Sequence, residues 1–304
     1  METNAVQKVD IKLVFTCNNR CSFCVQGDKR FSTPARDWGR IAEDLEQGFR
    51  NGARSLVLTG GEPTLQPRLL DAARLARTIG YSVVQIQSNG RRFFYRDFCR
   101  ACIDAGANEF SPALHGSCPE IHDSLTRAPG SFLQTLHGIR NLKELGQTVI
   151  ANTVITAGNY QDLPLLAGLL VSLEVDQFQF AFVHVLGEAR KNASWLVPRK
   201  SAAAPFIQEG LRIGREAGVR CFTEAIPYCF MKEFEDCIAE KIIPQTLIFD
   251  GNNVIPDYNS YRHTLGKTKG PQCRICRYFT VCEGPWKEYP ELFGWDEFFP
   301  IAAP

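Results

Sequence analysis

The chain has 304 residues, of which 44% are hydrophobic, and a formal net charge of +1. This length suits one large domain, or one domain with a smaller appendage, and the hydrophobic content excludes a disordered chain. The balanced charge gives no electrostatic reason to expect a nucleic-acid or acidic-membrane partner. The N-terminal stretch METNAVQKVDIKLVF lacks the apolar core of a signal peptide, and no apolar run is long enough to cross a bilayer. We therefore expect a cytoplasmic protein with no membrane partner.

Short apolar runs alternate with amphipathic stretches along the first 218 residues. The expected strands cover residues 11–16, 55–60, 82–88, 107–114, 148–155 and 177–185. The expected helices cover residues 37–52, 67–80, 96–106, 131–146, 160–174 and 204–218. Six successive β–α units predict an α/β fold in which a parallel sheet curls into a partial (β/α)6 barrel of the TIM type. In such barrels the chemistry sits at the carboxyl ends of the strands.

The alternation stops after residue 218. The remaining residues are rich in proline, aromatic residues and cysteine. We therefore expect two domains, a partial barrel over residues 1–218 and a small irregular domain over residues 219–304 that a metal centre supports.

Twelve cysteines also require an explanation. In a reducing compartment, clustered cysteines bind metals or do redox chemistry more often than they form disulfides. Two tight groups stand out, 17–24 and 273–282, with three cysteines each. For most of the other six, the simpler interpretation is a small buried hydrophobic side chain; these are Cys99, Cys102, Cys118, Cys221, Cys229 and Cys237.

The first group, CNNRCSFC, directly follows the first expected strand and so lies at the catalytic face. Three thiolates at this spacing can converge on one metal centre. A four-iron cluster and a structural zinc site each take four ligands. A set of three therefore leaves one position open to a ligand that is not protein, as reactive metal sites do. An incomplete zinc knuckle is the structural alternative.

The pattern C-x3-C-x-F-C after the first strand of a β–α array resembles the signature of the radical S-adenosylmethionine (SAM) enzymes, over about residues 8–220. The resemblance implies that Cys17, Cys21 and Cys24 hold a [4Fe–4S] cluster whose remaining iron binds SAM through its amino and carboxylate groups. It also implies that one electron, from a flavodoxin- or ferredoxin-type donor, cleaves SAM to methionine and a 5′-deoxyadenosyl radical. That radical abstracts a hydrogen atom from the substrate.

The resemblance also implies SAM-binding roles at other strand ends. In TGGEP, Gly60 and Gly61 would let the backbone approach the ligand, and Glu62 would hold the methionine amino group. An ordinary glycine-rich turn is the alternative there, and an Asn-Gly turn without ligand is the alternative after the third strand. The further expected positions are Phe23 beside the adenine, Ser88 and Asn89 at the ribose, Ser111 and Arg127 at the methionine carboxylate, Asn152 on the fifth strand, and Val185 with Leu186 along the adenine.

Two residues near the fourth strand are candidates for a catalytic role. His115 would point into the barrel mouth together with Ser111, and a structural histidine is the alternative. Cys118 could donate a hydrogen atom or resolve a radical, and a buried thiol is the alternative.

The second group, CRICRYFTVC, resembles the auxiliary-cluster domains called SPASM and, when shortened to one cluster, Twitch. The longer pattern continues with a further cysteine where this chain has Trp286, so we expect one auxiliary [4Fe–4S] cluster. Cys273, Cys276 and Cys282 would need a fourth ligand, for which Cys229 is the first choice and Cys221 and Cys237 compete. Four ligands would make the cluster electron-transferring and structural, whereas three would leave an iron free for substrate. A zinc ribbon is the alternative.

The sequence thus predicts a radical SAM enzyme that acts on a peptide or small polar molecule, in the maturation of a peptide natural product or a cofactor. Only about ten residues precede the first strand, so we expect no N-terminal peptide-recognition domain. A non-catalytic iron–sulfur redox or scaffold protein is the alternative, and it would need neither TGGEP nor a SAM pocket. A zinc-dependent nucleic-acid binder is disfavoured because no basic run is present.

Overall fold

The computed structural model describes residues 6–302. Within them, one sheet has nine strands in the order β7-β6-β5-β4-β3-β2-β1-β8-β9. The strands are β1 Lys8–Val14, β2 Ser55–Gly60, β3 Val83–Ser88, β4 Glu109–Pro112, β5 Thr148–Ile155, β6 Gln177–Phe182, β7 Arg220–Glu224, β8 Thr246–Asp250 and β9 Asn253–Ile255. Every neighbouring pair is parallel except β8 with β9. The prediction of an α/β partial barrel is confirmed.

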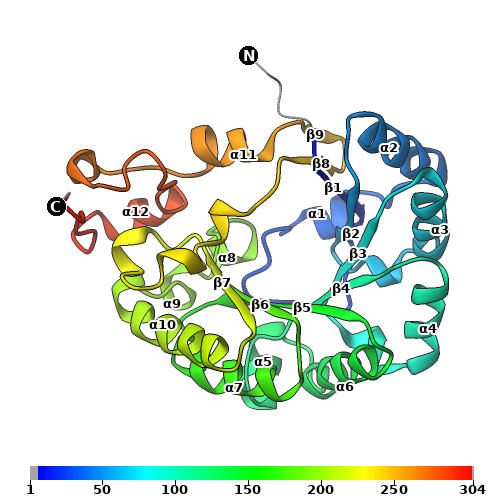
Figure 1. Ribbon diagram of the computed structural model, residues 1–304, viewed down its shortest axis with the longest axis horizontal. Helices are drawn as coiled ribbons and strands as arrows, with labels where there is room; N and C mark the ends of the chain where they lie inside the picture. Colours follow the sequence, from blue (N-terminus) through cyan, green and yellow to red (C-terminus); the bar gives the residue numbers. More distant parts are fainter. Residues whose placement is uncertain (1–5, 303–304) are drawn as a thin grey trace.

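The longer helices lie on the outside of the curved sheet (Figure 1). They are α2 Trp38–Arg50, α3 Leu69–Ile79, α4 Arg96–Asp104, α5 Pro119–Thr126, α6 Ser131–Glu144, α7 Leu163–Ser172 and α10 Lys200–Glu216. The shorter ones are α1 Lys29–Ser32, α8 Glu188–Lys191, α9 Ala193–Leu196, α11 Tyr258–Tyr261 and α12 Glu288–Phe293. Among the described helices, none is both long and apolar enough to span a membrane.

The apolar core lies between the sheet and this outer layer of helices. On β1, Val9, Ile11 and Leu13 are fully buried and belong to this core. The residues between them face the other way, because successive side chains of a strand point to opposite faces. Lys8 and Asp10 accordingly line the interior of the barrel. The barrel therefore has an apolar outer wall and a polar inner one.

Three strands that the sequence analysis did not predict, β7, β8 and the three-residue β9, lie after residue 218, and the first two extend the predicted array directly. β7 pairs in parallel with β6, and β8 pairs in parallel with β1, so both edges of the six-stranded array are extended. Each is only five residues long and is not followed by a long helix, so the β–α alternation that indicated the first six strands is missing. The remaining chain consists mainly of short helical turns and loops, seen in orange and red in Figure 1.

Candidate metal and cofactor sites

The loop that follows β1 carries the first cysteine group to the carboxyl ends of the strands. Cys17, Cys21 and Cys24 all line one cavity of about 420 Å³. Of the other residues that we predicted for this site, Phe23, Gly60, Gly61, Ser88, Asn89, His115 and Asn152 also line it. Residues from β1 through β6 thus converge on the cysteine loop, as expected when the carboxyl ends of parallel strands meet at one edge.

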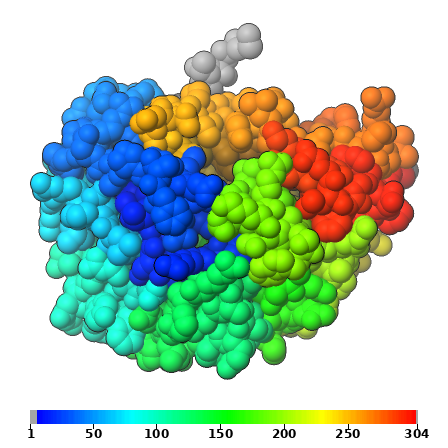
Figure 2. Space-filling model, turned by 180° about the vertical axis from the view of Figure 1, so that it is seen from behind, coloured from blue at the N-terminus to red at the C-terminus, as the bar shows by residue number. Residues whose placement is uncertain are grey.

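The cysteine loop is held in place by backbone hydrogen bonds to two distant segments. Arg20 N and Ser22 N donate to carbonyls at the end of α5, each over 2.9 Å. Glu188 N donates to the Cys24 carbonyl over 2.8 Å, and a Cβ on Gly187 would lie 2.6 Å from that same oxygen. Figure 2 shows the blue cysteine-loop segment beside the green segment around α8. The sequence analysis missed Gly187, although a glycine directly after the sixth strand is a signal of close backbone approach.

The environment of the thiols suits a metal centre. Burial, followed by the nearby Cys17 and Cys24, raises the pKa of the Cys21 thiol, and burial likewise raises the pKa of Cys17. These thiols are therefore neutral unless a metal draws off their protons, which couples metal binding to proton release. Asn19 N donates to Cys17 Sγ over 3.3 Å, and Asn89 Nδ2 lies 3.8 Å from the same sulfur. Hydrogen bonds to a ligand sulfur tune an iron–sulfur centre.

The TGGEP turn needs its two glycines because it lies against the end of β1. A Cβ on Gly60 would lie 2.1 Å from the Val14 carbonyl oxygen, and a Cβ on Gly61 would lie 2.2 Å from that of Phe15. Gly60 also has a φ of +138°, which side chains rarely allow. The two glycines thus bring the turn against the strand that leads into Cys17.

Glu62 does not line the cavity but lies fully buried behind its wall. Its carboxylate accepts hydrogen bonds from Thr64 N over 3.0 Å, Thr64 Oγ1 over 2.5 Å, Ser88 Oγ over 2.8 Å and Asn89 N over 2.8 Å. Burial raises the pKa of Glu62, and these hydrogen bonds act in the opposite direction. Glu62 therefore orients Ser88 and Asn89, and through Asn89 the Cys17 sulfur.

His115 and Phe23 form an aromatic part of the cavity wall. Their rings meet edge to face with centroids 4.6 Å apart. Burial holds the pKa of His115 well below its usual value, and Val154 N donates to its Nδ1 over 3.2 Å. A neutral imidazole with one nitrogen occupied by the backbone favours the structural interpretation of His115.

Besides Glu62, five of the predicted site residues do not line this cavity, namely Ser111, Cys118, Arg127, Val185 and Leu186. Ser111, which we expected at the barrel mouth, instead lines a deeper cavity within the barrel. Arg127 is exposed, Cys118 lies just before α5, and Val185 is buried. The positions of these side chains therefore give no support to the roles predicted for them.

The structure adds wall residues that the sequence analysis missed, notably His184 and Trp286. Their rings are stacked with centroids 3.9 Å apart and planes at 4°. Glu288 Oε2 lies 3.3 Å from His184 Nε2. Trp286 follows Cys282 by four positions, so the segment that carries the second cysteine group reaches the wall of the first site. The motif spacing alone could not show this contact.

The second cysteine group closes around a small pocket of about 30 Å³. Four thiols line it together with aromatic, proline and glycine residues and Lys269; they are Cys229, Cys273, Cys276 and Cys282. Burial, together with the three neighbouring thiols, raises the pKa of Cys229 to about 12. The structure thus brings Cys229 to the C-terminal trio.

The two competing cysteines lie elsewhere. Cys221 and Cys237 are 5% and 3% exposed, and neither lines the pocket of the C-terminal trio. A hydrogen bond with Cys237, together with burial, raises the pKa of Cys221, and Cys221 Sγ also donates to the Leu211 carbonyl over 3.3 Å. These two thiols therefore interact with each other.

Neither cysteine group is arranged as a preformed site for a single metal ion. Within residues 6–302, no three His, Cys, Asp or Glu side chains come close enough together to hold one metal ion. With Zn–S bonds of about 2.3 Å, four sulfurs on one zinc would lie roughly 4 Å apart. In a four-iron cluster each cysteine binds a different iron, which requires wider spacing. The described residues thus contain no preformed zinc knuckle or ribbon.

Comparison with known proteins agrees with this geometry. The chain is 29% identical to the AdoMet-dependent heme synthase of Methanosarcina barkeri, over 93% of this chain and 91% of that protein. It is 27% identical to the PqqA peptide cyclase of Rhodopseudomonas palustris, over 62% of this chain and 50% of that protein. The crystal structure of Streptococcus suis SuiB bound to precursor peptide SuiA shares the fold, with a TM-score of 0.65 and 15% identity over 88% of this chain and 62% of that one.

The chain thus spans half to two thirds of the length of the last two proteins. A family model described as the Radical SAM superfamily matches residues 11–166, just over half of the chain. This segment contains the cysteine loop, the TGGEP turn, the second half of β1 and the four strands β2 to β5. The chain belongs to the Radical SAM superfamily.

Proposed function

We propose that this radical SAM enzyme cleaves SAM reductively and abstracts a hydrogen atom from a peptide or small polar substrate, in the maturation of a peptide natural product or a cofactor. The observation that carries the proposal is the convergence of Cys17, Cys21, Cys24 and the Gly60-Gly61 turn on one cavity. When bound, the cluster and SAM supply the 5′-deoxyadenosyl radical. A flavodoxin- or ferredoxin-type protein is the proposed electron donor, by family analogy.

The side chains around the cavity have separate tasks in this proposal. The three cysteines would hold the cluster and would leave one of its positions to SAM. The backbone of Gly60 and Gly61 provides a surface without side chains along which SAM can lie. Glu62 acts as a positioning residue through Ser88 and Asn89. Phe23 and His115 give one side of the cavity an aromatic surface that holds few polar groups near the reacting end of SAM.

We also propose that Cys229, Cys273, Cys276 and Cys282 bind one auxiliary [4Fe–4S] cluster. Four thiols around one pocket support a complete ligand set, which leaves no iron open to substrate. The auxiliary cluster then serves structure and electron transfer rather than substrate anchoring. The stacked pair of Trp286 and His184 supports such a role because it connects this segment to the barrel cavity.

A peptide substrate is supported by two of the similar proteins. One is named as a cyclase of the peptide PqqA, and the other is seen with the precursor peptide SuiA. The likeness to the haem synthase extends over nearly the whole of both chains and supports the same two-part organisation.

Anaerobic reconstitution followed by dithionite and SAM tests the enzymatic proposal against the non-catalytic scaffold. We expect 5′-deoxyadenosine from the wild-type chain and none from Cys21→Ala. Absence of 5′-deoxyadenosine from the wild type would favour the scaffold, and turnover by Cys21→Ala would refute the cluster assignment.

Iron analysis tests the second site. Two four-iron clusters give about eight irons per chain, and we expect Cys229→Ser and Cys276→Ala to lower this to about four. Cys237→Ser is the matched control, since this buried thiol lies outside the pocket, and should keep about eight. An unchanged iron content in Cys229→Ser would show that the fourth ligand is another residue.

A further inference from the structure

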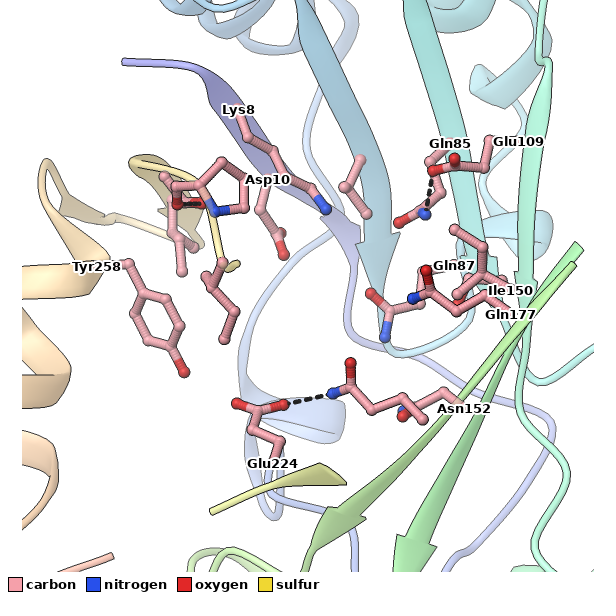
Figure 3. A pocket seen from close by; sticks show the side chains of 17 residues that line it. Lys8, Asp10, Gln85, Gln87, Glu109, Ile150, Asn152, Gln177, Glu224 and Tyr258 are labelled. Atoms are coloured by element: carbon pink, nitrogen blue, oxygen red, sulfur yellow. Dashed lines mark hydrogen bonds between the residues drawn. The ribbon is translucent and has the colours of Figure 1, made fainter. Parts of the chain in front are cut away.

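A second cavity, of about 330 Å³, lies inside the barrel (Figure 3). Lys8 of β1 lines it, whereas Lys12 lines the cysteine cavity, so it lies on the amino-terminal side of that cavity. Asp10, Gln87, Asn152, Glu224 and Tyr258 line both, so that the two cavities form one continuous lumen. Ligand pockets in proteins are commonly of this size. Nothing proposed above uses the deeper half of this lumen.

The deeper cavity is lined by side-chain amides. They come from alternate positions of three strands and are Gln85, Gln87, Asn152, Gln177 and Gln179. In small barrels these inward positions are ordinarily filled by bulky branched residues such as valine and isoleucine. Here only Val57, Ile150 and Ile248 are of that kind. The interior is therefore built to remain open and polar rather than to pack as a core.

Much of the hydrogen-bonding capacity of these amides is unused. Gln85 Nε2 donates to Glu109 Oε1 over 2.5 Å, and Gln179 Nε2 donates to Glu224 Oε2 over 2.7 Å. These two pairs leave both amide carbonyls and one N–H of each amide free. Among the described residues, no protein hydrogen bond involves the side-chain amides that remain, which are those of Gln87, Asn152 and Gln177.

The first of these pairs is built into the strand register, since Gln85 lies opposite Glu109 on β4. Gln179 lies opposite Phe222 on β7 and reaches Glu224 two residues further along that strand. Each carboxylate thus fixes the orientation of a neighbouring amide, which presents its free donor and acceptor to the lumen (Figure 3). Leaving a buried polar group without a hydrogen-bond partner costs free energy. Such a wall therefore favours a ligand that supplies both donors and acceptors.

The charged side chains that line the lumen limit the class of ligand that it could bind. Three carboxyl groups line the lumen, those of Asp10, Glu109 and Glu224. Two amines also line it, those of Lys8 and Lys12. No arginine is among the described residues that line it, although arginine is the side chain best suited to phosphate and carboxylate groups. A triphosphate or a polycarboxylate would therefore find no arginine to pair with in this lumen, and it would lie beside these carboxyl groups. Peptide groups, each with one donor and one acceptor, match the carboxamides without adding charge.

The length of the lumen suits an extended chain. Lys8 and Lys12 line its two halves, four residues apart on β1. At about 3.3 Å per residue this separation is roughly 13 Å. An extended segment of about four residues covers the same distance.

We propose that the amide-lined lumen is the recognition site for an extended peptide segment of the substrate, whose peptide groups hydrogen-bond to Gln85, Asn152 and Gln179. This proposal rests on the proposed function, because it places the substrate beneath the site of hydrogen abstraction. It names peptides as the substrate class and locates specificity in residues that do not touch the clusters.

The test uses the full chain, anaerobically reconstituted, and a capped tripeptide, N-acetyl-Gly-Gly-Gly-methylamide, as the probe. A matched analogue replaces the central amide N–H with an ester oxygen. Since one hydrogen bond contributes about 0.5–1.5 kcal/mol, the capped tripeptide should bind about 2- to 10-fold more tightly than the ester in saturation-transfer NMR titrations. GTP serves as a probe of the alternative nucleotide class.

Substitutions in the lumen test where the tripeptide binds. Gln85→Leu and Gln179→Leu should each weaken binding of the tripeptide by a similar factor. Gln161→Leu is the matched control, since Gln161 is exposed on the outer turn before α7, and it should bind as the wild type does. If Gln179→Leu does not fold, a double variant can replace it. In Gln179→Glu/Glu224→Gln the amide and the carboxylate exchange places, and the hydrogen bond between the two positions is kept. The exchange removes the free N–H at position 179 and should also weaken binding.

The outcomes separate this proposal from the proposed function. Equal binding of amide and ester, no binding of the tripeptide, or tighter binding of GTP would each overturn the peptide site. Formation of 5′-deoxyadenosine by the wild type is measured independently of any probe. If 5′-deoxyadenosine forms but the amide and the ester bind equally, only the peptide site is refuted. If the amide binds more tightly than the ester but no 5′-deoxyadenosine forms, only the radical chemistry is refuted.

Discussion

Replacing Gly61 with alanine adds one methyl group at the contact between the TGGEP turn and the strand that leads into the cysteine loop. The new Cβ would lie 2.2 Å from the Phe15 carbonyl oxygen and 2.5 Å from that of Thr16. Both obstacles are backbone atoms, so rotation of a side chain cannot relieve the contact. Either the turn or the end of β1 must move.

The size of the movement follows from these distances. Real Cβ contacts essentially never fall below 3.0 Å, so the two segments must separate by roughly 1 Å. Cys17 follows Thr16 directly and moves with it. A misplacement of about 1 Å near reacting groups costs about 100-fold in rate, and overpacking of this kind typically costs about 1–3 kcal/mol of stability.

We therefore expect Gly61→Ala to form 5′-deoxyadenosine about 100-fold more slowly than the wild type and to unfold at a lower denaturant concentration. Gly168→Ala is the control, because Gly168 lies within α7 with nothing within 4 Å of its added Cβ. That variant should keep its rate and gain up to about 1 kcal/mol of stability from helix propensity. A wild-type rate in Gly61→Ala, with unchanged stability, would show that the turn does not control the position of the cysteine loop.

Two further predictions concern buried polar groups. Glu62→Gln presents an N–H₂ group to donors on Thr64, Ser88 and Asn89, so we expect a loss of about 1–3 kcal/mol and slower SAM cleavage; unchanged denaturation and cleavage would contradict this arrangement. Burial lowers the pKa of His122 from 6.5 to about 4. The unfolded chain therefore binds a proton that the folded chain rejects, and stability falls as the pH drops below about 6.5. Between pH 7.5 and 5.5 this loss amounts to about 1 kcal/mol in denaturant titrations. His122→Asn keeps an acceptor for His115 N and should lose less over the same pH range, whereas an equal loss in both proteins would exclude His122 as the source.

The six-stranded part of the fold was predictable because its signals are local. Each strand and the helix after it repeat one pattern of apolar residues, and that pattern requires only neighbours in the chain. The same holds for CNNRCSFC and CRICRYFTVC, in which a few residues suffice to bring three thiols near one another. β7 and β8 escaped prediction because five-residue strands in a segment rich in proline carry no such repeat.

The polar barrel interior left a local signal that the sequence analysis did not use. The strands read KVDIKLV, VVQIQS and QFQFAF, in which at least two polar residues recur at alternate positions. Strands of a parallel sheet covered on both faces are ordinarily near-continuous apolar runs. The alternation therefore indicates an open lumen, and it could have predicted Gln85, Gln87 and Gln179 as interior residues.

The amino-acid sequence alone determined the kinds of element, their order and the thiols available for metal, since periodicity and short spacings depend only on residues close in the chain. The tertiary structure decided which distant residues meet. It placed Cys229 rather than Cys221 or Cys237 beside the C-terminal trio, and it stacked Trp286 on His184 in the wall of the barrel cavity. These contacts depend on how β7 and β8 dock at opposite edges of the sheet, which is set by the packing of the whole barrel and not by any local segment.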